Sequence, residues 1–156
     1  MADMLVKLYE FAPDLNLRRK LESKGFTVRR ALPPERSTVL RWVAEEFGKE
    51  WADECAVAFA RQPSTCFIAL QEDGLAGFSC CEATCRDFFG PTGVRPDLRR
   101  QGLGKALLDI ALEDLKARGY AYAIIGDAGP LEFYERYCGA VPIPDSVPGI
   151  YKGMLR

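Results

Sequence analysis

The stretch Val94-Arg95-Pro96-Asp97-Leu98-Arg99-Arg100-Gln101-Gly102-Leu103-Gly104-Lys105-Ala106-Leu107-Leu108 carries the strongest signal in this chain. It predicts the end of a strand, a short loop and the first turns of a helix. Its two glycines allow a ligand to approach the backbone closely. The N–H groups of the first helical turn have no acceptor within the helix and point at an anion along the positive end of the helix dipole. We therefore expect a diphosphate-bearing ligand at this junction.

The same loop does not match the common nucleotide-binding motifs. A Walker A loop requires Gly at position 99 and Ser or Thr at position 106, where this chain has Arg99 and Ala106. A dinucleotide fingerprint requires a third Gly at position 107, which is Leu107. The segment therefore predicts an anion-binding site at the start of a helix. The alternative interpretation is an ordinary helix start, in which the glycines are needed for the geometry of the loop and the arginines are solvated.

Two sequence blocks together resemble the GNAT family of N-acetyltransferases. The family's acetyl-CoA signature, Arg/Gln-x-x-Gly-x-Gly/Ala at a strand-to-helix junction, corresponds to Arg99–Gly104, with the usual Val-x-Pro before it at 94–96. A second block, aromatic-Tyr before a Gly at the end of a short helix, corresponds to Phe133-Tyr134 and Gly139. The resemblance covers roughly residues 26–156, so we divide the chain into an N-terminal extension at 1–25 (a short strand and a helix) and an acetyltransferase domain at 26–156.

The pattern of elements predicts the α/β class with a mixed sheet. The resemblance implies the GNAT fold, a mostly antiparallel central sheet flanked by helices, with one splayed parallel strand pair. Alternation and turn residues predict strands at 4–11, 26–32, 65–70, 75–82, 88–94, 120–125, 140–143 and 150–155. Helical periodicity and capping residues predict helices at 15–23, 35–47, 50–61, 103–118 and 130–138.

Strand 88–94 is expected to be irregular. It contains Gly90, Pro91 and Gly93, and proline lacks a ladder donor while glycine weakens pairing. The resemblance implies a bulge that splays this strand from its parallel neighbour, with the pantetheine arm of CoA in the resulting wedge. A turn at 71–74 is expected to join the two preceding strands into a hairpin.

The resemblance assigns cofactor contacts to two segments. Thr92, Gly93 and Val94 would contact the acyl and pantetheine part of acetyl-CoA, and an amide near Val94 would hold the oxyanion. The diphosphate segment comprises Arg99, Arg100, Gln101, Gly102, Leu103, Gly104 and Lys105. Asp127 stands where many relatives carry a cofactor-contacting Asn; because a carboxylate repels phosphate, it would instead face the acceptor or cap the helix at 130.

Tyr134 is the predicted general acid, on the resemblance. A phenol can donate a proton to a thiolate as it leaves. The alternative is that Tyr134 is a packed aromatic, with Tyr137 as the second candidate. For the base that deprotonates the acceptor ammonium, we predict Glu82, with Asp87 and Glu54 as alternatives. The competing interpretation of each of these residues is a solvated carboxylate on the surface.

Composition limits the remaining choices. A length of 156 residues suits one domain, and a net charge of −1 gives no electrostatic case for nucleic acid or an anionic membrane. The first residues lack the features of a signal peptide, so we expect a cytoplasmic protein with reduced cysteines. With no His and no CxxC pair, a metal site at Cys80, Cys81 and Cys85 is not expected, and triads with His are excluded.

The predicted function is transfer of an acetyl group from acetyl-CoA, as cosubstrate, to a primary amine by direct attack in a ternary complex. The alternative is a catalytically silent acetyl-CoA-binding module that regulates a protein partner. Longer acyl groups remain a third possibility. The acceptor is left open between small molecules, amino sugars and proteins. The oligomeric state is also left open, with a homodimer as one candidate.

Overall fold

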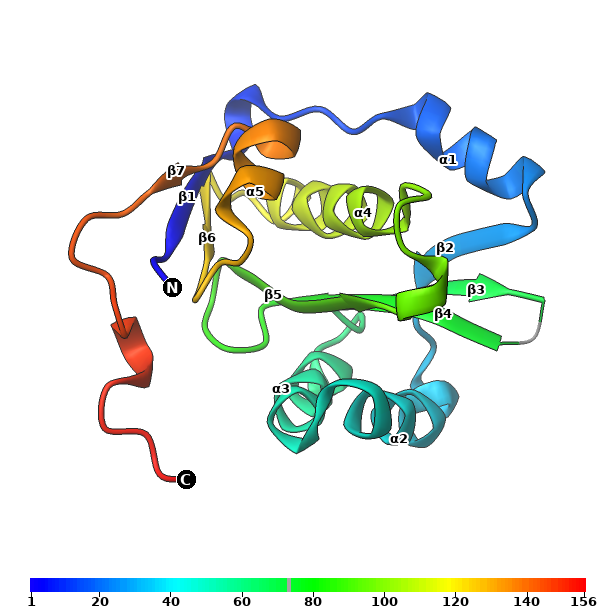
Figure 1. The fold of residues 1–156 in the computed structure, drawn as a ribbon, viewed down its shortest axis with the longest axis horizontal. Helices are drawn as coiled ribbons and strands as arrows, with labels where there is room; N and C mark the ends of the chain where they lie inside the picture. Colours follow the sequence, from blue (N-terminus) through cyan, green and yellow to red (C-terminus); the bar gives the residue numbers. More distant parts are fainter. Residues whose placement is uncertain (73) are drawn as a thin grey trace.

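The computed structural model describes residues 1–72 and 74–156, which form one seven-stranded mixed sheet with helices on both faces (Figure 1). The strand order is β2-β3-β4-β5-β6-β1-β7. The strands are β1 (Met4–Lys7), β2 (Phe26–Arg30), β3 (Cys66–Gln71), β4 (Gly74–Cys81), β5 (Phe88–Val94), β6 (Tyr122–Ile125) and β7 (Val141–Pro142). The helices are α1 (Leu15–Ser23), α2 (Arg36–Phe47), α3 (Lys49–Ala60), α4 (Leu103–Ala117) and α5 (Leu131–Cys138).

Two apolar cores lie on the two faces of the sheet. Helix α4 lies on one face with α1 and α5, and α2 and α3 cover the other (Figure 1). Residues of β3 alternate between the cores: Phe67 and Ala69 pack towards α4, whereas Cys66 and Ile68 pack towards α3. This period of two is the expected consequence of strand geometry. The α/β class and the mixed sheet predicted from the sequence are confirmed.

Strand β5 is irregular, as its glycines and proline predicted. Its pairing with β4 shifts register between Ser79 and Cys81, which face Thr92 and Phe89, so β5 carries one extra residue. The parallel pairing of β5 with β6 is limited to Phe88↔Ile124 and Phe89↔Ile125. Beyond Phe89, β5 continues to Val94 while β6 ends at Ile125, and this opens the sheet between the two strands.

The N-terminal residues are part of the same sheet. Strand β1 pairs antiparallel with β6 on one side and with β7 on the other. Its alternate side chains, Met4 and Val6, are fully buried. Asp14 caps α1 by accepting from the amides of Asn16 and Leu17. The segment predicted as an extension therefore contributes a strand to the sheet, between β6 and the edge strand β7, although this strand is shorter than the predicted 4–11.

The strand predicted at 150–155 is wrong. This segment contains a short 3-10 turn at Gly149–Tyr151, and Gly149 and Gly153 both have positive φ. These two turns prevent an extended strand, and β1 already fills the space between β6 and β7. The chain after β7 instead leaves the sheet and runs towards α3 (Figure 1). The hairpin turn predicted at 71–74 includes Asp73, which lies outside the described residues.

Candidate active site

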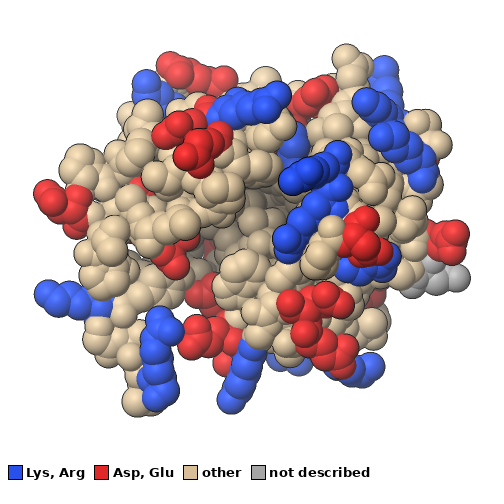
Figure 2. All heavy atoms as spheres, viewed as in Figure 1, with Lys and Arg blue, Asp and Glu red and all other residues tan. Residues whose placement is uncertain are grey.

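A cavity of about 500 Å³ lies where β5 and β6 part. Figure 2 shows a hollow in the centre of this face, with Asp and Glu side chains gathered below it, towards α3. The cavity walls come from the start of α3, from β5, from the turn after β6, from α5 and from the C-terminal segment. The residues that line it include Glu50, Trp51, Asp53, Glu54, Thr84, Phe88, Phe89, Gly90, Pro91, Thr92, Ile125, Asp127, Tyr134, Val147, Pro148, Tyr151, Met154, Leu155 and Arg156.

Tyr134 on α5 lines this cavity with only 5% of its surface exposed. Its ring packs edge-on against Phe89 and Phe133. Within the described part of the chain, its hydroxyl has no hydrogen-bond partner. Burial, and secondarily the nearby Cys138, raise its pKa well above that of an ordinary phenol, so the hydroxyl keeps its proton at neutral pH.

The predicted diphosphate segment has the backbone geometry of an anion site. Arg100 and Gly102 have φ of 65° and 96°, in the left-handed region, and Gly102 is the N-cap of α4. No side chain caps this helix, so the amides of its first turn remain available to a ligand. The left-handed φ favours glycine here, and a Cβ at Gly102 would lie 2.7 Å from Leu17 Cδ1 of α1, so that side chain would have to move.

Several side chains of this segment are already engaged. Arg99 Nε donates to Val94 O at 3.1 Å, and Gln101 Nε2 lies 3.5 Å from Leu98 O. The ammonium of Lys105 pairs with the buried Asp109, which also accepts from the amide of Asp14 at 3.0 Å. Leu103 is buried in the core. These contacts leave the backbone and Arg100 as the groups available to an anion, so the role of Lys105 would be indirect.

The acyl-contact segment of β5 is held rigidly against β4. Thr92 Oγ1 donates to Phe78 O at 3.1 Å, and Gly93 and Val94 lie opposite Phe78 and Gly77. A Cβ at Gly93 would lie 2.6 Å from Phe47 Cζ, so only glycine fits beneath this ring. Beyond Phe89 the structure pairs no described strand with the other edge of β5. This edge is therefore open to a ligand that runs from the diphosphate segment to the cavity.

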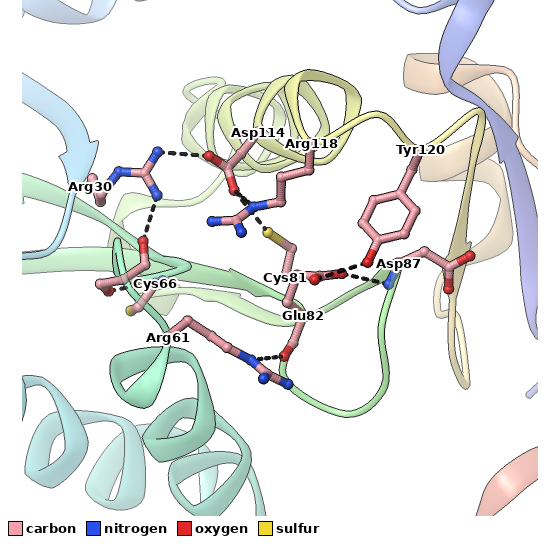
Figure 3. A network of polar contacts seen from close by, with 10 residues as sticks. Arg30, Arg61, Cys66, Cys81, Glu82, Asp87, Asp114, Arg118 and Tyr120 are labelled. Atoms are coloured by element: carbon pink, nitrogen blue, oxygen red, sulfur yellow. Dashed lines mark hydrogen bonds and ion pairs between the residues drawn. The ribbon is translucent and has the colours of Figure 1, made fainter.

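Glu82, the first candidate for the base, lies outside the cavity lining. Figure 3 shows its carboxylate between two partners: the amide of Asp87 donates to Oε1 at 2.6 Å, and the Tyr120 hydroxyl donates to Oε2 at 3.1 Å. Its backbone carbonyl accepts from Arg61 Nε at 3.1 Å. The residue is 7% exposed. These contacts fix the loop between β4 and β5, and Asp87 is likewise absent from the cavity lining.

Glu54, one of the two alternatives, does line the cavity. Burial raises the pKa of its carboxyl, and hydrogen bonds from Tyr151 and Thr84 partly oppose that shift. The Tyr151 hydroxyl donates to Oε1 at 3.1 Å. A carboxylate with a raised pKa that faces the same cavity as a protonated phenol is the combination a base and an acid require. The structure therefore brings Tyr134 and Glu54 to one cavity.

Asp127 also lines the cavity but does not cap α5. Pro130 occupies the N-cap position of that helix without a side-chain cap. The Asp127 carboxylate accepts from the amino group of Met1 at 2.6 Å, and its amide donates to Asp3 Oδ1 at 2.8 Å. The carboxylate thus faces a cation, away from the α5 amides.

A family model described as acetyltransferase (GNAT) family matches residues 36–140. The chain belongs to the GNAT acetyltransferase family. No curated protein matches the chain in sequence.

Solved structures share the GNAT fold at low identity. A fungal multi-domain GH3 β-N-acetylglucosaminidase with a GCN5-related glucosamine N-acetyltransferase region superposes with a TM-score of 0.73 and 15% identity, over 91% of this chain and 19% of that one. A GCN5-related N-acetyltransferase from Sphaerobacter thermophilus superposes with a TM-score of 0.64 and 20% identity, over 91% of this chain and 48% of that one. A GNAT acetyltransferase from Brucella melitensis in complex with acetyl-CoA superposes with a TM-score of 0.57 and 16% identity, over 72% of this chain and 80% of that one. The chain thus spans less than half the length of the first two.

The GNAT structure contains two groups that the sequence interpretation missed. One is the C-terminal segment, whose residues Val147, Pro148 and Tyr151 line the cavity. The preceding Pro-rich turn is a weak indication that this segment leaves the sheet, because three prolines within seven residues disfavour continued strand pairing. The other is the pair of acids Glu50 and Asp53 at the start of α3, which precede Glu54, the predicted alternative base, within five residues.

The cysteines that lie together in this GNAT protein are not the three whose metal site was considered and not expected from the sequence, Cys80, Cys81 and Cys85. Cys55, Cys66 and Cys80 bring three buried sulfurs within 4.8 Å of one another, with 3.7 Å between Cys55 Sγ and Cys66 Sγ. Cys81 faces the other core, 3.7 Å from Asp114 Oδ2. Three thiols are one ligand short of the four of a structural zinc site, and the absence of a metal remains a prediction. Among residues 1–72 and 74–156, no helix combines the length and apolar character needed to cross a bilayer.

Proposed function

We propose that this GNAT protein transfers an acetyl group from acetyl-CoA to a primary amine by direct attack in a ternary complex. The observation that carries the proposal is Tyr134, a buried tyrosine whose hydroxyl has no partner within the described residues and which faces the cavity where β5 and β6 part. The residues present fit acetyl-CoA, because the uncapped amides of α4 and the open edge of β5 lead to this cavity. Acetyl-CoA, when bound, supplies the activated acetyl group.

Each proposed role follows from the environment of the residue. The amides that follow Gly102 would hold the diphosphate, with Arg100 as the available cation. Glu54 would accept the proton of the acceptor ammonium, which must be neutral before it attacks. Tyr134 would donate its proton to the departing sulfur, and the raised pKa that burial gives it keeps that proton in place beforehand. Glu82 would act as a positioning residue for the β4–β5 loop, through Asp87 and Tyr120.

Binding and turnover are tested separately. Calorimetric titration with acetyl-CoA, against ATP as a control, should give micromolar affinity for acetyl-CoA and much weaker binding of ATP. Thiol release with a panel of amines then measures transfer. Tyr134→Phe should lower kcat by about 10²-fold or more and leave acetyl-CoA affinity unchanged, because it removes the proton donor but keeps the ring. Tyr137→Phe is the matched control on the same helix and should retain the wild-type kcat.

The other outcomes discriminate between the candidates. Full activity of Tyr134→Phe across the pH range would remove the general-acid role. Tight acetyl-CoA binding without thiol release from any amine would favour the alternative of a silent acetyl-CoA-binding module that acts on a protein partner. Failure to bind acetyl-CoA would overturn both.

A further inference from the structure

The cavity proposed as the acceptor site is rich in acidic side chains. Glu50, Asp53 and Glu54 of α3 and Asp127 after β6 line it, whereas Arg156 is its only lining Lys or Arg side chain among the described residues. Arg156 reaches Glu50 at 3.9 Å, with both side chains about two-thirds exposed, so this pair is weak. Asp127 pairs with the amino group of Met1. The Asp53 carboxylate makes no ion pair or hydrogen bond with any described residue, and the Glu54 carboxylate accepts only from neutral groups.

The other walls suit an ammonium group with an alkyl chain. Trp51, Phe88 and Tyr151 line the cavity beside the acids. Aromatic faces attract cations and also cover methylene groups. Trp51 packs on Phe47, and that ring covers Gly93 of β5, so the wall is connected directly to the acyl-contact strand. A chain that extends from β5 towards α3 would therefore lie between aromatic rings and end among carboxylates.

The direction of such a ligand is set by Tyr134. This side chain is more than nine-tenths buried, and its hydroxyl has no partner within the described residues, so it marks the inner end of the cavity as a polar position that a ligand completes. The acids of α3 come from the helix layer on the other face of the sheet from α5 (Figure 1), and Glu50 and Asp53 are exposed. A ligand whose reacting amine lies near Tyr134 and Glu54 would place its far end near Asp53.

We propose that the acceptor is a diamine or polyamine, whose second ammonium group binds at Asp53 while the first is acetylated. This inference rests on the proposed acetyl transfer. The step balances as follows: Glu54 receives the ammonium proton, the neutral amine forms the C–N bond of the amide, and the thioester C–S bond breaks. Tyr134 supplies the thiol proton, and the second proton that the attacking nitrogen loses restores the Tyr134 hydroxyl, so that one proton in all passes through Glu54 to solvent. The second ammonium group remains charged throughout and serves only for binding.

Three amines of the same length test the inference. We expect kcat/KM for 1,4-diaminobutane to exceed that for 1-aminobutane by about threefold to fivefold, because an ion pair with an exposed carboxylate contributes only modestly. For 4-aminobutanoate, whose far end is negative, the value should fall below that of 1-aminobutane. The preference should lie mainly in KM and should decrease at high salt, because exposed ion pairs are screened.

Two variants assign the effect to its residue. Asp53→Asn should reduce the ratio between 1,4-diaminobutane and 1-aminobutane towards one. Glu22→Gln, on the exposed surface of α1, changes charge equally and should retain the wild-type ratio. Equal kcat/KM for the two amines in the wild-type protein would overturn the diamine inference and leave acetyl transfer standing.

A binding measurement separates the two failures. Calorimetry with the protein saturated with CoA measures the affinity for 1,4-diaminobutane without turnover. Binding that depends on Asp53, in the absence of thiol release, would support the cationic ligand and overturn acetyl transfer. Absence of both binding and thiol release with every amine would overturn the inference together with the proposed function.

Discussion

At the scale of single residues, burial acts in the same direction on two side chains of the cavity and has different consequences. It raises the pKa of both Tyr134 and Glu54, because the charged form loses hydration in each case. For a phenol that must donate a proton, this shift preserves the active form. For a carboxylate that must accept one, it increases basicity, as long as the pH stays above the raised pKa. One desolvated cavity thus favours both proposed roles.

The first prediction at this scale concerns Gly102. Gly102→Val should abolish measurable acetyl-CoA binding, because the left-handed φ of 96° disfavours valine and its Cβ would meet Leu17 at 2.7 Å beside the ligand-facing amides. Gly119→Val is the matched control: its φ is 95°, no described atom lies within 4 Å of the added Cβ, and it is remote from the segment. Calorimetry on both variants is the measurement. Equal affinities would show that the loop does not hold the ligand.

At the scale of elements, an ionic network joins the sheet to α4. Arg30 of β2 and Arg118 after α4 both bond to Asp114 at 2.7 Å, as seen in Figure 3. Burial raises the pKa of Asp114, but the hydrogen bonds from the two arginines outweigh that effect and hold the pKa below its usual value. Because the folded pKa is lowered, the stabilisation is complete above the unfolded pKa and is lost as pH falls through the folded pKa.

Asp114→Asn tests this network. We expect it to lower the free energy of unfolding by about 1–3 kcal/mol at neutral pH, since two guanidinium groups lose their anionic acceptor. The loss should shrink as the pH falls below the unfolded carboxyl pKa. Asp97→Asn, which removes the exposed pair with Arg95, should change stability by less than about 0.5 kcal/mol. Urea unfolding at two pH values measures both, and an equal loss in the two variants would contradict the assignment.

Elements with strong local signals were predicted from the sequence to the residue. Helix 15–23 and strand 88–94 have the predicted bounds, and Asp14 caps the first turn of that helix. The failures involve long-range competition. Segment 150–155 has strand-like composition, but the place beside β6 belongs to β1, and no local pattern reveals which of two distant segments pairs there.

The residues of the candidate site also fall into those that a local pattern predicts and those that depend on long-range packing. The loop at Gly102 was predictable because its residues are contiguous. Which of Glu82 and Glu54 faces the cavity could not be predicted from the sequence, because that depends on how distant segments pack. Glu82 lies at a strand end next to the bulged strand, yet its carboxylate turns to the β4–β5 loop. Glu54 lies on α3, which packs on the other face of the sheet from α4 and α5, and it still lines the cavity.

At the scale of the whole molecule, the cavity depends on segments from both halves of the chain. Tyr151 of the C-terminal segment bonds to Glu54 of α3, a contact that spans 97 residues. Because this hydrogen bond lowers the pKa of Glu54, its removal should raise that pKa further. The C-terminal segment would thereby adjust the proton affinity of the proposed base.

Tyr151→Phe tests that coupling. The acid limb of the kcat/KM profile, where activity rises as Glu54 loses its proton, should move to higher pH. At neutral pH the loss should be about tenfold or less, because the carboxylate itself remains. Glu54→Gln should remove the limb altogether. A profile in Tyr151→Phe identical to that of the wild-type protein would mean that the segment closes the cavity without affecting the base.

The position of β1 also has a consequence for the order in which the protein folds. Both of its neighbours in the sheet, β6 and β7, follow it by more than 110 residues along the chain and are therefore synthesised much later. Until then a nascent chain exposes Met4, Val6 and Leu8 without their partners. Such pairings close a long loop and are slow to form. We therefore expect completion of the sheet to be a late event in synthesis, with the first strand incorporated only after β6 has emerged.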